Sequence, residues 1–306
     1  MRAPLIELIL AHCLSDSNAL FLTGDLGFSV VEPLQDALGD RFINAGVAEQ
    51  NMMTMAAALA DTGYLPYVYS IAPFVTARSF EQIRNDVCYH KRPVIIVGTG
   101  AGLSYGSLGP SHHSLEDAAI LSALPGMRVL SPANAAELAA VHRMALAYPG
   151  PTYLRVSRED GPTFDVPSFA GFEDAAHCVA DGTEICLVAS GPAVATALDA
   201  RELLGKRGVS ARVVSVPVLT PFPAVGLARC LPEGLPVLSI FEGYVGSPLD
   251  LGLRRLLMQR KSHVAYREVA VPLSYPEKVG NTEFLRKAFG IDAPNVAMAS
   301  LDLLGV

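Results

Sequence analysis

GVAEQNMMTMAAALA, residues 46–60, is a helix-forming segment that lies between two short apolar runs. Its Ala, Met and Leu residues are good helix formers, so we expect a helix over residues 48–60. The flanking runs, residues 20–23 and 66–69, have the length and composition of buried strands. Glu49 stands near the start of the expected helix. Taken alone, it is explained as a first-turn carboxylate that complements the helix dipole.

The same alternation of apolar runs and helical patterns continues along the chain. Further strands are expected at residues 94–98, 128–131, 152–156, 184–189, 211–216, 237–241 and 264–269. Further helices are expected at residues 77–89, 114–124, 134–147, 193–206 and 248–260. Asn134 and Glu137 have the spacing of an N-terminal capping box. Strands that alternate with helices predict parallel sheets covered on both faces.

Residues 159–183 interrupt this rhythm with several glycines and prolines and no clear periodicity. Such a segment is typical of a linker. The sequence therefore predicts an α/β protein with two doubly wound parallel-sheet domains, residues 1–160 and 183–306, joined by a linker at residues 161–182.

Composition narrows the class of protein. The chain has 306 residues, a formal net charge of −7 and no long basic run, which argues against a nucleic-acid partner. Only 17% of the residues are charged, against about 25% on average, so extra surface is expected to be buried against other subunits. No signal peptide and no apolar run long enough to span a membrane are evident. We expect a cytoplasmic protein with reduced cysteines at positions 13, 88, 178, 186 and 230.

Three segments carry the candidate chemistry. They are GVAEQNM at residues 46–52, SIAPFVTAR running into RSFEQIRNDV at residues 70–87, and GPSHHSLED at residues 109–117. The paired histidines, taken alone, are also compatible with a helix-capping turn that leaves both imidazoles in water. A glycine cluster at residues 98–102 is compatible with a phosphate-binding loop or with a tight turn after a strand.

Together these segments resemble the pyrimidine-binding domain of the transketolase family. The order and spacing match from Asp25 through Glu49, Phe74 and His112 to Arg158. The likeness is greatest to split transketolases, in which the C-terminal half is a separate chain. It covers residues 1–160 strongly, and the part from residue 182 onward, including Phe-Glu-Gly at residues 241–243, resembles the family's C-terminal domain more loosely.

The resemblance implies a set of residues for thiamine diphosphate. Glu49 is the family glutamate that exchanges a proton with N1′ of the aminopyrimidine ring, which calls for a carboxyl group held in a dry site. Phe74 is the aromatic residue on which that ring stacks, and Asp25 lies beside the cofactor. Ile71 replaces a second aromatic residue of the pocket wall. Arg78 is included with this cofactor-binding set.

The resemblance also implies a substrate-binding set. His112 matches the histidine that faces the reacting carbon and the substrate hydroxyls, where a neutral imidazole exchanges protons near pH 7. We place His113 beside it in this set. Arg158 matches an arginine that holds a sugar phosphate, and Ser29 and Arg2 fall on the family's other phosphate contacts.

Other positions depart from the family pattern. A sugar-binding aspartate is replaced by Leu108, a second substrate histidine is replaced by Gly100, and Tyr105 and Ser107 are not the usual residues. A pentose-phosphate transketolase is expected to keep those polar contacts. We therefore expect an unusual ketose, acceptor or acyl substrate.

The family holds the cofactor's diphosphate and its Mg²⁺ ion with a GDG motif and a downstream asparagine, and GDG does not occur in this sequence. Thr-Gly-Asp-Leu at residues 23–26 lies in the wrong domain for that role. We therefore expect a large N-terminal partner subunit that holds the diphosphate and Mg²⁺, in an α2β2 heterotetramer. The expected activity is transfer of a two-carbon ketol unit from a phosphorylated ketose.

Three alternatives remain at this point. One is the β subunit of a 2-oxo-acid dehydrogenase E1 component, which shares the glutamate and the split chain but not the segment at residues 109–116. Another is a hybrid that loads a two-carbon unit onto a carrier protein. The last is a non-catalytic subunit that keeps the fold, which the joint presence of Glu49, Phe74 and His112 disfavours. Detection of thiamine diphosphate in the purified complex of this chain with its partner would distinguish an enzyme subunit from the non-catalytic one.

Overall fold

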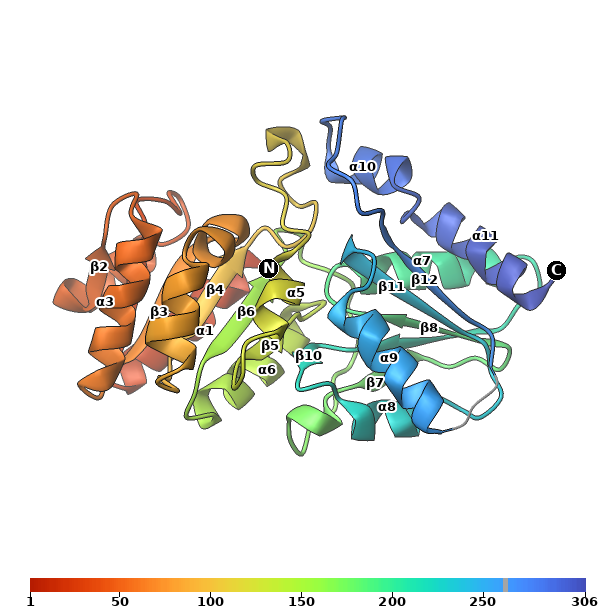
Figure 1. The fold of residues 1–306 in the computed structure, drawn as a ribbon, viewed down its shortest axis with the longest axis horizontal. Coiled ribbons are helices and arrows are strands. Elements are labelled where there is room, and N and C mark those ends of the chain that lie inside the picture. The colour runs from red at the N-terminus through yellow and green to blue at the C-terminus, as the bar shows by residue number, and fades with distance from the viewer. Residues whose placement is uncertain (261–263) are drawn as a thin grey trace.

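The computed structural model describes residues 1–260 and 264–306. Figure 1 shows two α/β lobes side by side, the first built mainly from the red-to-yellow-green part of the chain and the second mainly from the green-to-blue part. Each lobe has a mostly parallel sheet with helices packed against it. The predicted fold class is therefore confirmed, with the difference that both sheets are mixed.

The first sheet has seven strands in the order β10-β5-β6-β4-β3-β1-β2. The strands are β1 Ala19–Thr23, β2 Phe42–Asn44, β3 Leu65–Ile71, β4 Ile95–Thr99, β5 Arg128–Leu130, β6 Thr152–Val156 and β10 Val218–Thr220. All pairs are parallel except β10 with β5. Strands β1, β4 and β6 are buried along their whole length, because helices cover both faces of the sheet.

The helices of the first lobe include two that the sequence patterns do not predict. They are α1 Arg2–Ser15, α2 Glu32–Leu38, α3 Glu49–Asp61, α4 Phe80–Gln82, α5 Asp117–Ser122 and α6 Ala135–Ala147. Helices α1 and α2 are the unpredicted ones. The segment expected as a helix over residues 77–89 begins earlier, as wide π-helical turns at Phe74–Arg78 and Ile83–Cys88 on either side of α4. Such turns often occur at functional sites.

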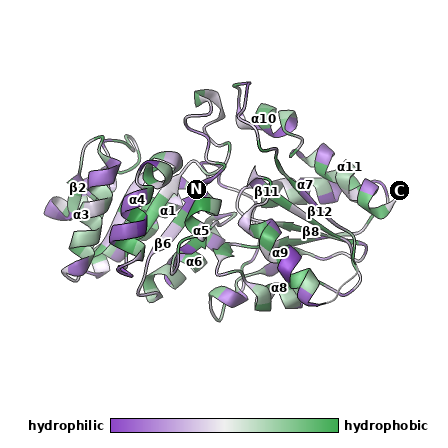
Figure 2. Cartoon of the chain, viewed as in Figure 1, coloured by the Kyte–Doolittle hydropathy of each residue, from purple (hydrophilic) through white to green (hydrophobic). Residues whose placement is uncertain are grey.

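The second sheet has five strands in the order β12-β11-β8-β9-β7. They are β7 His177–Ala180, β8 Ile185–Ala189, β9 Ala211–Ser215, β11 Val237–Tyr244 and β12 Tyr266–Val271. The helices are α7 Ala193–Gly205, α8 Ala224–Cys230, α9 Pro248–Gln259, α10 Thr282–Ala288 and α11 Ala293–Leu304. Figure 2 shows that the central strands are mainly hydrophobic, whereas helices such as α9 carry hydrophilic residues on part of their surface.

Two short strands differ from the predicted organisation. β7 lies within the segment expected to be a linker, and it pairs antiparallel with the edge of the second sheet. β10 follows β9 in the chain but completes the first sheet by pairing antiparallel with β5. Both strands cover a sheet edge that would otherwise expose unpaired backbone groups.

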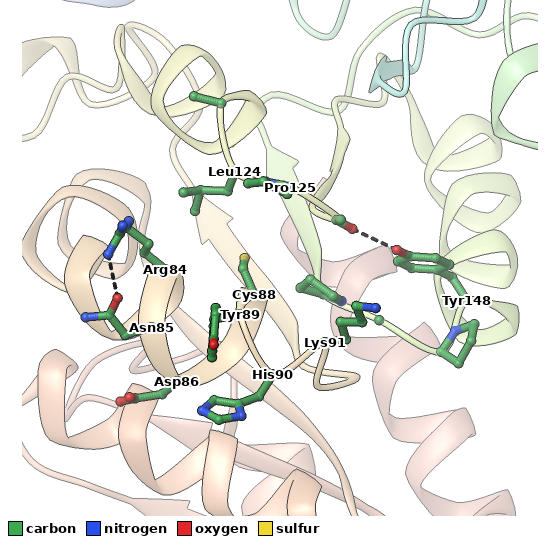
Figure 3. A pocket seen from close by; sticks show the side chains of 15 residues that line it. Arg84, Asn85, Asp86, Cys88, Tyr89, His90, Lys91, Leu124, Pro125 and Tyr148 are labelled. Atoms are coloured by element: carbon green, nitrogen blue, oxygen red, sulfur yellow. Dashed lines mark hydrogen bonds between the residues drawn. The ribbon is translucent and has the colours of Figure 1, made fainter.

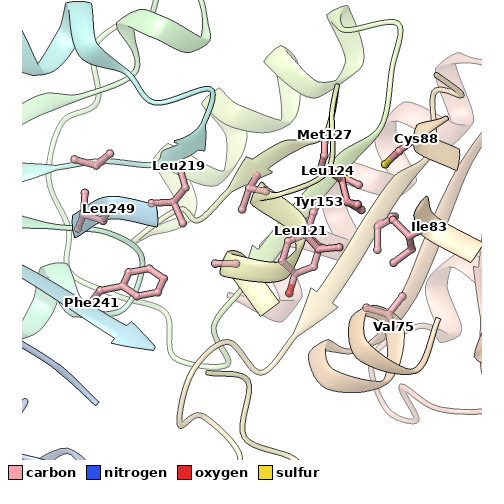
Figure 4. Packing of buried hydrophobic residues seen from close by; sticks show 14 of the residues in the cluster. Val75, Ile83, Cys88, Leu121, Leu124, Met127, Tyr153, Leu219, Phe241 and Leu249 are labelled. Carbon is pink, nitrogen blue, oxygen red and sulfur yellow. The ribbon is translucent and has the colours of Figure 1, made fainter. Parts of the chain in front are cut away.

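One hydrophobic core runs from the first lobe into the second. Leu121 and Tyr153 belong to the same buried cluster as Leu219 of β10, Phe241 of β11 and Leu249 of α9. Figure 4 shows these side chains between the two sheets. Burial of this shared apolar surface holds the second lobe against the first. Side chains from both lobes are therefore held in place at their common edge.

Candidate active site

The candidate residues lie just beyond the carboxyl ends of neighbouring parallel strands. Asp25 follows β1, Phe74 follows β3, Gly100 follows β4 and Arg158 follows β6. Ligands in open α/β sheets bind at this edge. The alternation of strands and helices therefore brings residues together that are far apart in the sequence.

Glu49 begins α3 and is 2% exposed. Its Oε2 atom accepts a hydrogen bond of 2.6 Å from Nη1 of Arg78, while its Oε1 atom has no hydrogen-bond partner among residues 1–260 and 264–306. Gly24 faces this carboxylate, and a Cβ atom added there would lie 3.8 Å from Oε1. A carboxylate that only complements the helix dipole could remain in water. Glu49 is instead buried, with one oxygen bound and the other available.

Phe74 lies between Arg78, which binds Glu49, and His112. The guanidinium of Arg78 lies over the Phe74 ring, 4.5 Å from its centroid. The His112 ring meets the same phenylalanine edge-on, with 5.1 Å between the ring centroids. Ile71, at the end of β3, is half-buried. Glu49, Arg78, Phe74 and His112 thus form one continuous series of contacts.

Tyr105 fills the space that a side chain at position 100 would need. A Cβ atom added to Gly100 would overlap the Tyr105 ring, and Gly100 has a φ of +83° that favours glycine. The guanidinium of Arg158 lies 4.6 Å from the centroid of this ring, and His112 lies 6.2 Å from it, centroid to centroid. In the sequence Tyr105 stands out only as a departure from the family, so its central position was missed.

Arg158, Arg2 and Ser29 line one cleft of about 480 Å³. Asp160 and Glu7 also line the cleft, so its lining includes acidic as well as basic residues. Ser29 is exposed and has a φ of +64°, an uncommon conformation for a residue with a side chain. The structure therefore brings together the three residues that the resemblance assigns to a phosphate group.

Asp25 lies in the same strained turn as Ser29, with a φ of +54°. Its backbone N–H donates to Oδ1 of Asn44 and its carboxylate accepts from Nδ2 of Asn44, both at 3.0 Å. Strained backbone that the surrounding structure holds in place is common at functional sites. Asn44, at the end of β2, was not identified from the sequence.

His113 does not share the environment of its neighbour His112. Its side chain is buried, and Nε2 lies 3.3 Å from the carbonyl oxygen of Gly106 within the same loop. Burial lowers the pKa of His113 below its ordinary value of 6.5. This position favours a role in shaping the loop over contact with a substrate, whereas His112 is half-buried and faces Phe74 and Tyr105.

A larger cavity, of about 1030 Å³, lies away from these residues (Figure 3). Its lining comes from residues 84–86, 88–91, 123–126 and 148–151. Those segments lead into the amino ends of β4, β5 and β6, so the cavity opens at the opposite edge of the sheet. The chemical groups discussed above therefore do not belong to it.

Comparison with known proteins identifies the chain. Residues 7–163 match the family described as "Transketolase, pyrimidine binding domain", and residues 174–296 match "Transketolase, C-terminal domain". The chain belongs to the transketolase family.

Three similar proteins show which part of a transketolase this chain represents. The chain is 28% identical to one of the subunits of the apulose-4-phosphate transketolase of Phocaeicola vulgatus, over 99% of this chain and 97% of that one. It is 30% identical to 6-deoxy-6-sulfo-D-fructose transketolase subunit SqwH of a Clostridium species, over 98% and 93%. A solved split-gene transketolase, an inactive β4 tetramer, superposes with a TM-score of 0.84 at 30% identity, over 99% and 97%. The chain therefore corresponds to the C-terminal subunit of split transketolases.

Transketolases depend on thiamine diphosphate, and the residues present fit one half of it. One carboxylate oxygen of Glu49 has no partner among the described residues. Arg78 binds the other oxygen and also lies over the aromatic ring of Phe74, so that ring is close to the carboxylate. These groups suit the aminopyrimidine ring. Within residues 1–260 and 264–306, no three His, Cys, Asp or Glu side chains gather as a metal site. No helix in that part of the transketolase chain is long and apolar enough to cross a membrane.

Proposed function

We propose that this chain supplies the aminopyrimidine half of a thiamine-diphosphate site and the substrate-facing wall of a two-carbon ketol transferase. A large N-terminal subunit completes the site in an α2β2 assembly. The observation that carries the proposal is the contact series Glu49, Arg78, Phe74 and His112 at the carboxyl edge of the first sheet. A non-catalytic subunit would have no need to keep a buried, half-engaged carboxylate beside an aromatic ring.

Bound thiamine diphosphate supplies the carbon that attacks the ketose carbonyl. Glu49 holds and exchanges a proton at N1′ of the aminopyrimidine, and its burial excludes competing water. Phe74 presents an aromatic ring to the cofactor, and Asp25 lies in the turn beside it. His112 donates or accepts a proton at a substrate hydroxyl, since a neutral imidazole serves both roles.

The cleft of Arg158, Arg2 and Ser29 supports a substrate with a terminal anionic group. A guanidinium fork matches the oxygens of phosphate or sulfonate. The related subunits are named for apulose 4-phosphate and for 6-deoxy-6-sulfofructose, which both carry such a group. Replacement of the family aspartate and histidine by Leu108 and Gly100 favours a ketose outside the pentose-phosphate series.

The diphosphate and Mg²⁺ belong, in this proposal, to the partner subunit. The sequence has no GDG motif, and the family places that motif on the other domain. Cytoplasmic location follows from the same proposal, because the sugar phosphates it uses are intracellular metabolites. The low charged fraction of 17% supports an extensive subunit interface.

Co-expression of this chain with a large N-terminal transketolase subunit tests the proposal. The purified pair is supplied with thiamine diphosphate and Mg²⁺, and xylulose 5-phosphate, fructose 6-phosphate, apulose 4-phosphate and 6-deoxy-6-sulfofructose are offered as donors with ribose 5-phosphate as acceptor. We expect a product two carbons longer than the acceptor with at least one donor, detected by mass spectrometry. Release of carbon dioxide from pyruvate, without ketol transfer, would instead indicate oxo-acid chemistry.

A further inference from the structure

A buried carboxylate of the second lobe reaches into the loop that carries Tyr105 and His112. Glu242 lies on β11, is 2% exposed, and accepts a hydrogen bond of 2.8 Å at Oε1 from the backbone N–H of Leu103. This bond joins residues 139 positions apart. Burying a carboxylate is costly unless it is paired and hydrogen-bonded. The groups that bind Glu242 therefore indicate its role.

The loop closes tightly around this carboxylate. The backbones of Gly102 and Ser114 exchange two hydrogen bonds, of 3.1 and 2.8 Å, which form the neck of a loop that contains Tyr105 and His112. A Cβ atom added to Gly102 would overlap Oε1 of Glu242, and Gly102 has a φ of +63°. The neck therefore has room for the carboxylate only because residue 102 is glycine.

Glu242 is fixed on its other side by two arginines. Nε of Arg286, on α10, donates to Oε2 at 2.6 Å, and the same guanidinium donates to Oε2 of Glu159 at 2.8 Å. Nη2 of the fully buried Arg155 donates to the backbone carbonyl of Glu242 at 2.9 Å. Burial disfavours a charged Arg286, but Glu242 and Glu159 outweigh it and raise the pKa of Arg286 above its ordinary value.

Helix α10 holds the same loop a second time. The hydroxyl of Thr282, in its first turn, donates to the carbonyl oxygen of Leu103 at 3.2 Å. Both backbone polar groups of Leu103 are thus bound by the second lobe. Figure 1 shows the yellow loop and the blue segment leading to α10 rising together from the edge between the lobes.

We propose that Glu242, oriented by Arg286, is a positioning residue that sets the substrate-facing loop of residues 102–114. The proposal rests on the proposed ketol transferase and gives the C-terminal domain a part in substrate binding. Glu49 and Arg78 are on α3 and the turn after β3, outside this loop. Release of the loop therefore weakens substrate binding and leaves the proton exchange at the cofactor intact.

The first arm of the test is amide hydrogen exchange on the full chain. Glu242→Gln removes the charge that Arg286 binds, and Glu242→Ala removes the acceptor as well. We expect faster exchange in peptides covering residues 102–114, with peptides of α3 and the β1–β3 strands unchanged. Glu137→Gln is the matched control, since that buried carboxylate also binds a backbone N–H, of Ala133, and a basic side chain, His177. Unchanged exchange of the loop in both Glu242 variants would overturn the proposal.

The second arm uses the assembled enzyme with the donor that the wild-type pair turns over. Loss of one charge-assisted hydrogen bond should raise the donor KM by roughly tenfold or more, while C2–H exchange of bound thiamine diphosphate stays within about twofold of wild type. Arg286→Met should reproduce this effect, and Arg286→Lys should restore part of it. A parallel fall of C2–H exchange and kcat at constant KM would show a general structural role. Absence of ketol transfer in the wild-type pair would refute the proposed function, whereas the first arm would still decide the role of Glu242.

Discussion

Arg158 is the residue at which the substrate's charge can be tested most simply. It shares a cleft with Arg2 and Ser29, and its guanidinium also packs on Tyr105. A phosphate bound by Arg158 would therefore lie close to Tyr105, the residue that also contacts His112. The contact with Tyr105 also means that the side chain contributes packing as well as charge.

Arg158→Ala should raise the KM for a phosphorylated ketose by about 10- to 100-fold, the loss expected for a hydrogen bond to a charged group. The KM for the unphosphorylated analogue should change much less, because only packing against Tyr105 is lost. Steady-state kinetics of the assembled enzyme with both sugars measures the difference. Arg207→Ala, at an exposed position after α7, is the control. Equal effects on the two sugars would remove Arg158 from the anion site.

At the same scale, the sequence predicts some site residues better than others. Glu49, Phe74 and His112 stand in segments with a recognisable order, and the structure brings them together. The roles assigned to them remain predictions. Tyr105 and Glu242 could not be found in this way, because each acts through a contact across the fold. The sequence shows only a glycine at positions 100 and 102. That the Tyr105 ring lies against Gly100 and the Glu242 carboxylate against Gly102 is visible only in three dimensions.

A buried hydrogen-bonded cluster ties three elements together on the other side of the first sheet. The hydroxyl of Tyr67 on β3 lies 2.9 Å from Nδ1 of His12 on α1 and 2.8 Å from Nε2 of His142 on α6. Burial, followed by the repulsion of His12 and Arg143, lowers the pKa of His142 to about 4. The folded state therefore holds a neutral imidazole at neutral pH.

This cluster predicts an acid-sensitive packing of α1 and α6. The pKa of His142 is lower in the folded state than its ordinary value of 6.5, so the unfolded chain binds the proton first as the pH falls. Stability should be intact above pH 6.5 and should decrease towards pH 4, by up to roughly 3 kcal/mol from this residue. Denaturant unfolding at several pH values measures this loss. In His142→Gln the decrease should be smaller, and an identical pH dependence would contradict the assignment.

Several elements with a clear apolar pattern were predicted, whereas strands β2, β7 and β10 and helices α1, α2, α8, α10 and α11 were not. Helices α3 and α6 and strands β4 and β6 lie close to their expected positions, because each has a clear apolar pattern of ordinary length. Strands β7 and β10 have four and three residues, too few for a periodicity to be seen. Their pairing at the edges of the sheets depends on tertiary contacts. The π-helical turns after β3 also share the apolar pattern of an ordinary helix and cannot be told from it.

On the scale of the whole molecule, the chain is expected to be half of a functional site. It corresponds to the C-terminal subunit of split transketolases and carries the aminopyrimidine side of the proposed site. Alone, it should bind thiamine diphosphate weakly, since the diphosphate and Mg²⁺ interactions belong to the partner in this proposal. Titration calorimetry of the isolated chain, with and without Mg²⁺, measures this affinity. Tight, Mg²⁺-dependent binding without a partner would contradict the division of the site between two chains.

Glu49→Gln in the assembled enzyme gives the most direct test of the catalytic role proposed for this subunit. The substitution keeps the size and hydrogen-bonding capacity of the side chain but removes the group that exchanges a proton with N1′. Asp250→Asn is the matched control, because Asp250 is also a buried first-turn carboxylate paired with an arginine, Arg254, on the remote helix α9.

The measurement is the rate of C2–H exchange of bound thiamine diphosphate, followed by NMR after an acid quench. We expect Glu49→Gln to slow the exchange by about 10²- to 10⁴-fold, the usual loss for a general acid–base group, and Asp250→Asn to leave it unchanged. If Glu49 served only the helix dipole, the variant would lose less than about 1 kcal/mol of stability and exchange at the wild-type rate. An unchanged exchange rate in a folded, assembled Glu49→Gln enzyme would contradict the proposed function of this chain.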